Sequence, residues 1–139
     1  LMIETLAKKL QDAAWMPAHL VKAKVFGKQF HTICSGGAYL NPAYIDLFKK
    51  YGITILQGYG MTECSPVIST NLSWNNKEDS VGKLLPNCEA KTVDEELWVR
   101  GSSVMQGYYH MPEETAATLE DGWLKTGDLG YVDGMGLYS

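Results

Sequence analysis

Hydrophobic positions recur with a helical period at the start of the chain. Across residues 2–15, apolar side chains return every three or four positions, which predicts an amphipathic helix that Pro17 ends. The stretch 18–27 predicts a second, shorter helix that Gly27 closes. The chain begins inside the first helix, and its last residues resemble the start of a strand, so we expect it to be part of a longer protein.

A strand, a helix and a second strand follow in that order. Residues 30–38 are a short apolar run that leads into the glycine turn SGGA, and 53–57 are another apolar run that leads into QGYG. Between them, Asn41 can cap a helix over 42–52 whose first residue is Pro42. This order predicts two parallel strands joined by a right-handed crossover, with ligands beyond their carboxyl ends.

The pattern changes in the second half of the chain, where turn residues separate short apolar runs. We expect a loop at 71–80, strands at 90–93 and 96–101, a helix at 112–120 and antiparallel strands within 121–136. The predicted fold class is therefore α/β, with a parallel βαβ portion followed by an antiparallel β-rich portion. We place the division between residues 1–75 and 76–139.

Composition and charge narrow the classes of function. Of 139 residues, 45% are hydrophobic and 20% charged, as in a globular domain. No apolar run approaches the roughly 20 residues that cross a bilayer. The net charge of −4, without a basic stripe, argues against a nucleic-acid partner. Cys34, Cys64 and Cys88 are an odd number without C-x-x-C spacing, so we expect free thiols and a cytoplasmic location.

Several common site patterns do not fit this sequence. GYGMTE begins like a dinucleotide-binding fingerprint, but Glu63 replaces the third glycine and would bring negative charge to the pyrophosphate. The pair at 82–83, GK, lacks the other residues of a phosphate-binding loop, and the histidines and cysteines lack zinc spacing. Cys34 and His31 have no third group to orient them, so a buried structural cysteine is the better interpretation of Cys34.

The stretch QGYGMTEC can bind a nucleotide if a metal ion lies between the Glu63 carboxylate and the phosphate. Mg2+ takes carboxylate and phosphate oxygens together, which would give Glu63 a place beside phosphate. Thr62 can donate to a phosphate oxygen, and Tyr59 can stack on a purine. Asp128, in the expected turn WLKTGDLG, has acceptor oxygens that suit a ribose diol. Each feature taken alone is also what a tight turn with a surface acid would show.

Four stretches occur together in a set order: SGGAYLNP, GYGMTECSPV, ELWVRGSSVMQGYY and PEETAATLEDGWLKTGDLGYVD. They resemble the adenylate-forming (AMP-binding) superfamily, most closely the long-chain fatty-acid–CoA ligases, over nearly the whole chain from about Val25. The resemblance implies an enzyme of fatty-acid metabolism that uses ATP, Mg2+ and CoA. The carboxylic acid would displace pyrophosphate from ATP to form an acyl-adenylate, and the thiol of CoA would then displace AMP.

The resemblance also assigns roles to single residues. Tyr59 would stack on the adenine, and Asp128 would hold the ribose hydroxyls. Thr62 would contact the α-phosphate and Glu63 would bind Mg2+, so these two are the expected catalytic residues. The remaining positions would line the nucleotide with their backbone, and they are Gly36, Gly37, Ala38, Gly58 and Gly60.

Several features of the family are not found in this sequence. These are the phosphate loop rich in Ser, Thr and Gly, the C-terminal domain with its lysine, and the arginine that follows the GDL motif. We therefore expect the isolated chain to be inactive and to bind nucleotide weakly, and we expect its exposed sheet edges to favour self-association. The segments around 94–96 and 133–137 are also shorter than in the family, so either these turns are trimmed or residues are missing from the sequence there.

Alternatives stay open on the sequence alone. An amino-acid or aryl-acid adenylation domain would load a carrier protein in place of CoA. A homologue that binds nucleotide without catalysis, or a purely structural module, is a further alternative, although such a protein need not keep all four of Tyr59, Thr62, Glu63 and Asp128. The chain length of the acid and any peripheral membrane contact of a longer protein are not encoded in these motifs.

Overall fold

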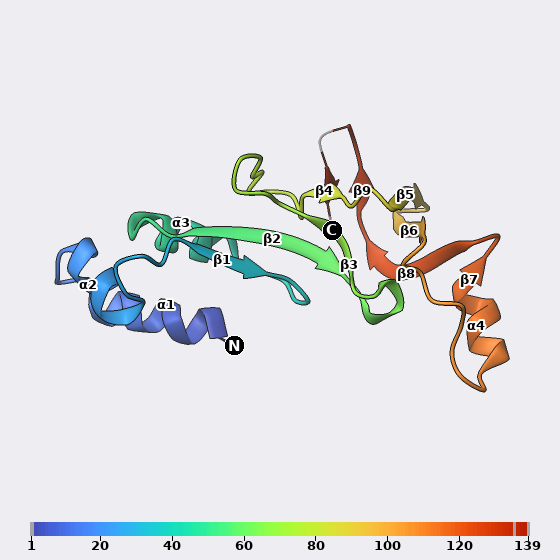
Figure 1. Ribbon diagram of the computed structural model, residues 1–139, viewed down its shortest axis with the longest axis horizontal. Helices are drawn as coiled ribbons and strands as arrows, with labels where there is room; N and C mark the ends of the chain where they lie inside the picture. Colours follow the sequence, from blue (N-terminus) through green and yellow to red (C-terminus); the bar gives the residue numbers. More distant parts are fainter. Residues whose placement is uncertain (1, 135, 139) are drawn as a thin grey trace. The chain divides into compact units, whose positions relative to one another are not determined.

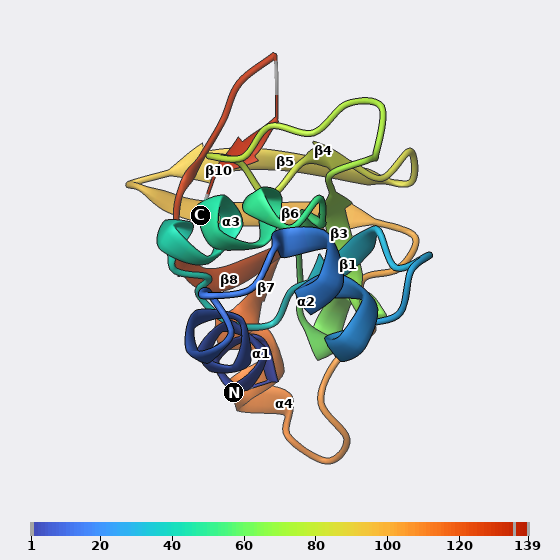
Figure 2. The same ribbon diagram turned by 90° about the vertical axis from the view of Figure 1, so that its left-hand side faces the viewer.

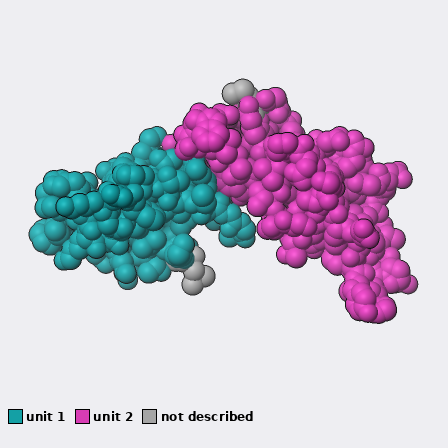
Figure 3. Space-filling model, in the orientation of Figure 1, with its two compact units in different colours: residues 1–56 teal, residues 57–139 magenta. Residues whose placement is uncertain are grey.

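The computed structural model describes residues 2–134 and 136–138, and the chain divides into two compact units at residue 56 (Figure 3). Met135, in the short segment noted above, lies outside the described residues. The change in sequence pattern falls near residue 75, whereas residues 57–75 belong to the second unit. They do so because strand β3 (Val67–Thr70) pairs within that unit.

The first unit is built from helices and two neighbouring strands that run parallel (Figure 1). Its elements are α1 (Met2–Asp12), α2 (Ala18–Val25), β1 (Thr32–Ser35), α3 (Pro42–Lys50) and the first half of β2 (Thr54–Gly60). The predicted helices and the parallel strand–helix–strand order are confirmed. Asn41 caps α3 as predicted, because its side-chain oxygen accepts a hydrogen bond from the Ala43 N–H at 3.0 Å.

The core of the first unit lies between the helices and the two strands. Leu10 of α1 and Phe48 of α3 are fully buried, and Figure 2 shows the two helices near each other. Tyr51 is also buried, and its hydroxyl donates to the backbone oxygen of Leu10 at 3.0 Å. This hydrogen bond satisfies the one polar group that the tyrosine brings into the core.

The second unit is rich in short antiparallel strands, as predicted from its turn residues. Its main sheet has the order β5-β6-β8-β7, and β5 and β6 lie side by side in Figure 2. After β2 and β3, its elements are the 3-10 turn η1 (Thr62–Cys64), β4 (Lys83–Leu84), β5 (Cys88–Val93), β6 (Glu96–Gly101), α4 (Pro112–Thr118), β7 (Leu119–Glu120), β8 (Trp123–Leu129), β9 (Tyr131–Val132) and β10 (Leu137–Tyr138).

The prediction of a glycine turn at QGYG was wrong. Gly58, Tyr59 and Gly60 form the second half of β2 and pair antiparallel with β3, with a bulge between Tyr59 and Gly60. Glycine is needed here because β2 and the following turn pack backbone against backbone. A Cβ on Gly60 would lie 2.0 Å from the Pro66 carbonyl oxygen, and one on Gly58 would lie 3.1 Å from the Ser69 oxygen.

The short segment around residues 94–96 forms the tight turn of the hairpin between β5 and β6. Val93 pairs with Glu96, so only Asp94 and Glu95 form the turn. Both have positive φ, at 48° and 67°. A two-residue turn with two positive φ angles matches the right-handed twist of the paired strands, and it needs no longer loop.

The core of the second unit is formed by apolar side chains from several of its strands and from η1. Leu97 and Val99 of β6 and Leu124 of β8 are fully buried. The same cluster also contains Cys64, Ile68 and Leu137. Because Val99 pairs with Leu124 across β6 and β8, the main sheet presents one continuous apolar face to this core. No helix in the described part of the chain is long and apolar enough to cross a membrane.

All three cysteines lie among the described residues and are free thiols, as predicted. The prediction that Cys34 is buried was wrong, because its side chain on β1 is exposed. Cys64 and Cys88 are buried, and burial raises the pKa of the Cys64 thiol to about 11, with smaller contributions from Cys88 and Glu63.

The thiols should therefore differ in reactivity. At pH 8, we expect a disulfide reagent such as dithionitrobenzoate to label Cys34 within minutes and Cys64 only after unfolding, because the thiolate is the nucleophile. Mass spectrometry of labelled peptides measures the order in which the cysteines react. Equal labelling of Cys34 and Cys64 in the folded chain would contradict the arrangement of the second core.

Candidate functional site

Tyr59 and Asp128, which are 69 positions apart in the sequence, meet through their side chains. Tyr59 lies on β2 and Asp128 near the end of β8, and both strands belong to the second unit at these positions. The Tyr59 hydroxyl donates to Asp128 Oδ2 at 2.5 Å. The Tyr59 ring packs against the second core, whereas Asp128 is exposed. The fold thus places an aromatic ring beside a carboxylate that faces solvent.

Asp128 lies on a strand, and the prediction of a turn at this position was wrong. Its backbone is held by polar side chains. The Asp128 N–H donates to Thr126 Oγ1 at 3.1 Å, and the Thr126 hydroxyl donates to the Leu97 oxygen at 2.7 Å. Gly127 has a φ of +73°, and its N–H donates to Glu96 Oε1 at 2.8 Å. This conformation favours glycine between the threonine and the aspartate.

Glu63 lies in η1, directly after β2, and is held by a segment that follows β6. The Met105 N–H donates to the Glu63 backbone oxygen at 2.7 Å, and the Tyr108 hydroxyl donates to Glu63 Oε1 at 2.8 Å. The bond to Glu63 raises the pKa of the Tyr108 phenol, with smaller effects of burial and of the carboxylate charge. Thr62, the other predicted catalytic residue, is exposed at the start of the same turn.

The predicted site residues divide between the two units. Gly36, Gly37 and Ala38 belong to the first, where they are exposed in the bend between β1 and α3, and Gly37 has a φ of +79°. The other predicted residues belong to the second unit, and they are Gly58, Tyr59, Gly60, Thr62, Glu63 and Asp128. The structure brings Tyr59 into contact with Asp128 and places Thr62 and Glu63 on η1, the turn that follows β2.

The number of carboxylates in this region bears on which metal ion it could bind. The described residues include no group of three or more His, Cys, Asp or Glu that could hold a metal ion. A single carboxylate, Glu63, fits Mg2+, which usually binds through one or two carboxylates and completes its shell with phosphate oxygens and water.

The Tyr59 phenol is held in its neutral form. Burial raises the pKa of Tyr59 well above its usual value, and the hydrogen bond to Asp128 raises it further. The hydroxyl therefore remains a donor to Asp128 across the physiological range. The unfolded chain would lose this proton near pH 10, so the contribution of Tyr59 to stability is present below that pH and is lost as pH rises above it.

A Tyr59→Phe substitution tests this bond. We expect it to lower the free energy of unfolding by about 1 kcal/mol at pH 7, because the ring is kept and one hydrogen bond is lost. The difference should shrink above pH 10, where ionisation of Tyr59 already destabilises the unsubstituted chain. Urea unfolding at pH 7 and above pH 10 measures the difference in free energy of unfolding between the variant and the unsubstituted chain. Tyr109→Phe is the control, since that side chain is 87% exposed, and equal losses in both variants would contradict the assignment.

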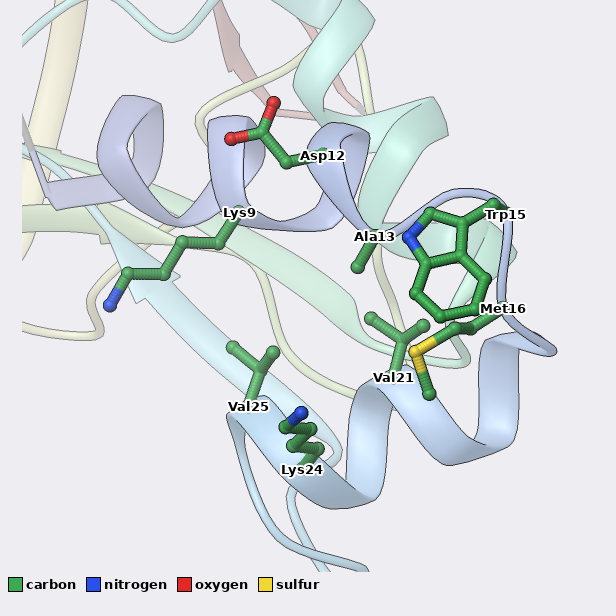
Figure 4. A pocket seen from close by; sticks show the side chains of 8 residues that line it. All are labelled: Lys9, Asp12, Ala13, Trp15, Met16, Val21, Lys24 and Val25. Carbon is green, nitrogen blue, oxygen red and sulfur yellow. The ribbon is translucent and has the colours of Figure 1, made fainter.

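A separate pocket of about 460 Å³ lies in the first unit, between α1 and α2 (Figure 4). It is lined by Lys9, Asp12, Ala13, Trp15, Met16, Val21, Lys24 and Val25. None of the predicted site residues belongs to it. The Trp15 side chain is 83% exposed at its rim.

Comparison with known proteins identifies the family of this chain. Residues 2–109 match the family model described as AMP-binding enzyme. A long-chain-fatty-acid–CoA ligase of Bacillus subtilis (strain 168) is 41% identical over 118 residues, which cover 75% of this chain and 21% of that protein. The chain therefore belongs to the AMP-binding enzyme family, as its motifs predicted.

Other relatives differ in the acid that their names specify. A 4-coumarate–CoA ligase-like protein 2 of Arabidopsis thaliana is 39% identical and covers 86% of this chain and 24% of that protein. A solved structure of O-succinylbenzoate coenzyme A synthetase from Bacillus subtilis, in complex with ATP and magnesium ion, is 31% identical with a TM-score of 0.67. It covers 86% of this chain and 29% of that chain. The present chain thus spans less than a third of each of these relatives.

Proposed function

We propose that this chain is part of an ATP-dependent acid–CoA ligase and that its second unit contacts the ribose, the adenine and Mg2+. The hydrogen bond between Tyr59 and Asp128 is the observation that carries this proposal. It places a flat ring, which can stack on adenine, next to an exposed carboxylate whose oxygens can accept from a ribose hydroxyl. Both residues stand at the positions that the family motifs assign to these contacts.

Glu63 and Thr62 would act on the phosphate side of the same nucleotide. They follow Tyr59 by only a few residues, on a turn held by backbone hydrogen bonds at both ends, from Cys64 to Met61 and from Met61 to Pro66. Mg2+ bound at Glu63 would neutralise phosphate charge. The Thr62 hydroxyl is exposed and would donate to the α-phosphate. For the first unit, the family resemblance assigns nucleotide contacts to Gly36, Gly37 and Ala38, and this assignment stays a prediction.

The reaction would proceed in two displacements. In the first, a carboxylate oxygen of the acid attacks the α-phosphorus of ATP while the bond to pyrophosphate breaks, which gives an acyl-adenylate. In the second, the sulfur of CoA attacks the acyl carbon, AMP leaves, and the thiol proton is released. Residues of this chain would hold the nucleotide in line for the first step, where positioning and charge neutralisation supply most of the catalysis.

A long-chain fatty acid is our proposed substrate, and the long-chain-fatty-acid–CoA ligase relative supports it. An aryl acid is the second candidate, because the 4-coumarate–CoA ligase-like protein is 39% identical to this chain and the O-succinylbenzoate coenzyme A synthetase is 31% identical. Both candidates share ATP, Mg2+ and CoA, so they differ only in the acid. We place the reaction in the cytoplasm, as the free thiols suggest.

Release of pyrophosphate by the full-length protein tests the proposal. The protein is mixed with Mg2+ and ATP, with and without CoA, across short, medium and long fatty acids, aryl acids and amino acids. We expect pyrophosphate release with a long-chain fatty acid and AMP release that depends on CoA. Release with aryl acids alone would favour the second candidate. No release with any acid by a folded protein would overturn the proposal.

A further inference from the structure

Tyr108 connects two parts of the second unit that are distant in sequence. It lies between β6 and α4, and its hydroxyl donates to Glu63 Oε1 at 2.8 Å across 45 positions. Among the described residues, no hydrogen bond to the other carboxylate oxygen, Oε2, is seen. The carboxylate is therefore held at one oxygen while the other remains open.

The segment that carries Tyr108 is itself fixed by α4. The Tyr108 N–H donates to Thr115 Oγ1 at 2.9 Å, and the Thr115 hydroxyl donates to the Met111 oxygen at 2.8 Å. Gly107, with a φ of +148°, permits this close approach, since a Cβ there would lie 2.8 Å from Thr115 Cγ2. The backbone at Tyr108 is thus tied to α4.

The same segment also holds the backbone around Glu63. The Met105 N–H donates to the Glu63 oxygen at 2.7 Å, and the Ser65 hydroxyl donates to the Ser103 oxygen at 3.0 Å. Ser65, at the end of η1, has a φ of +60°, so the turn is tightly specified. Residues 103–108 therefore fix both the backbone and one side-chain oxygen of Glu63.

We propose that Tyr108 is a positioning residue that orients the Glu63 carboxylate, with Oε2 turned to a divalent cation. The inference rests on the proposed function, because it gives Glu63 the role of metal ligand. A carboxylate without this partner would rotate about its last bond, and ordering it would cost free energy each time the cation binds. Hydrogen bonds behind a metal ligand typically change metal affinity or activity by about 10- to 100-fold.

Binding of Mn2+ with ATP tests the inference, with Mn2+ as a paramagnetic substitute for Mg2+. In the full-length protein, we expect Tyr108→Phe to weaken Mn2+ binding in the presence of ATP about tenfold by electron paramagnetic resonance. Tyr109→Phe, the adjacent and 87% exposed tyrosine, should leave it unchanged. In pyrophosphate exchange, Tyr108→Phe should raise the half-saturating Mg2+ concentration by a similar factor and leave kcat at saturating Mg2+ within about twofold.

A double-mutant cycle separates positioning from a general structural effect. If Tyr108 acts through Glu63, Tyr108→Phe should add nothing to the loss of Mn2+ binding in Glu63→Gln. If Tyr108→Phe caused an equal further loss of Mn2+ binding in the Glu63→Gln variant, or if Tyr108→Phe alone left Mn2+ binding unchanged, the inference would be overturned but the proposed function would not. Failure of the unsubstituted, folded protein to bind Mn2+ with ATP would overturn the proposed function, and the inference with it.

Discussion

Glu63→Gln is expected to lower the rate of adenylate formation by roughly 10²- to 10³-fold at a fixed Mg2+ concentration, the range seen when one electrostatic contact to a developing charge is removed. The substitution removes the negative charge that would hold the cation against the phosphates. It retains an oxygen that can accept the Tyr108 hydrogen bond, so the turn should keep its geometry. The loss should therefore come from chemistry and not from misfolding.

The measurement is exchange of labelled pyrophosphate into ATP by the full-length protein, over a range of Mg2+ concentrations. Glu114→Gln is the matched control, because Glu114 is exposed on the first turn of α4. It should behave like the unsubstituted protein. Thermal unfolding checks that both variants are folded. A Glu63→Gln variant that exchanges pyrophosphate at the normal rate would contradict the role of Glu63.

Leu124→Ala is expected to destabilise the second unit by roughly 2–5 kcal/mol, the usual cost of removing a buried leucine side chain. Leu124 is fully buried on β8, next to Val99 across the sheet and in one cluster with Leu97. Its removal would leave a cavity in this closely packed core, which the neighbouring side chains could fill only in part.

Leu129→Ala provides the control on the same strand, because the Leu129 side chain is 71% exposed. It should change the free energy of unfolding by less than about 0.5 kcal/mol. Urea unfolding of the chain, followed by tryptophan fluorescence, measures both variants, since Trp98 and Trp123 report on the main sheet. Similar losses for Leu124→Ala and Leu129→Ala would contradict the assignment of the core.

The parts of the fold that local sequence determines could be predicted. The helical period of residues 2–15 predicted α1, and Asn41 with Pro42 predicted the start of α3. The short strands β3 and β4 were not predicted, because strands of four and two residues carry too little periodicity. The glycines of QGYG suggested a turn, whereas in the fold they relieve backbone crowding between β2 and Pro66.

For the site, the sequence supplied residues but not their partners. Tyr59, Glu63 and Asp128 could be selected from motifs. Their positioning partners, which include Tyr108 for Glu63 and Thr126 for Asp128, act through side-chain contacts that only the folded chain shows. The block VMQGYY, residues 104–109, belongs to one of the family motifs. Nothing in its local pattern indicates which of its two tyrosines contacts the Glu63 carboxylate.

A crystal structure of the full-length protein with Mg2+ and a non-hydrolysable ATP analogue would test the central claim most directly. We predict that the ribose hydroxyls lie within hydrogen-bond distance of Asp128, that the adenine stacks on Tyr59, and that Mg2+ is bound by Glu63. A nucleotide that occupies another part of the protein, with Asp128 and Glu63 both facing solvent, would contradict the account.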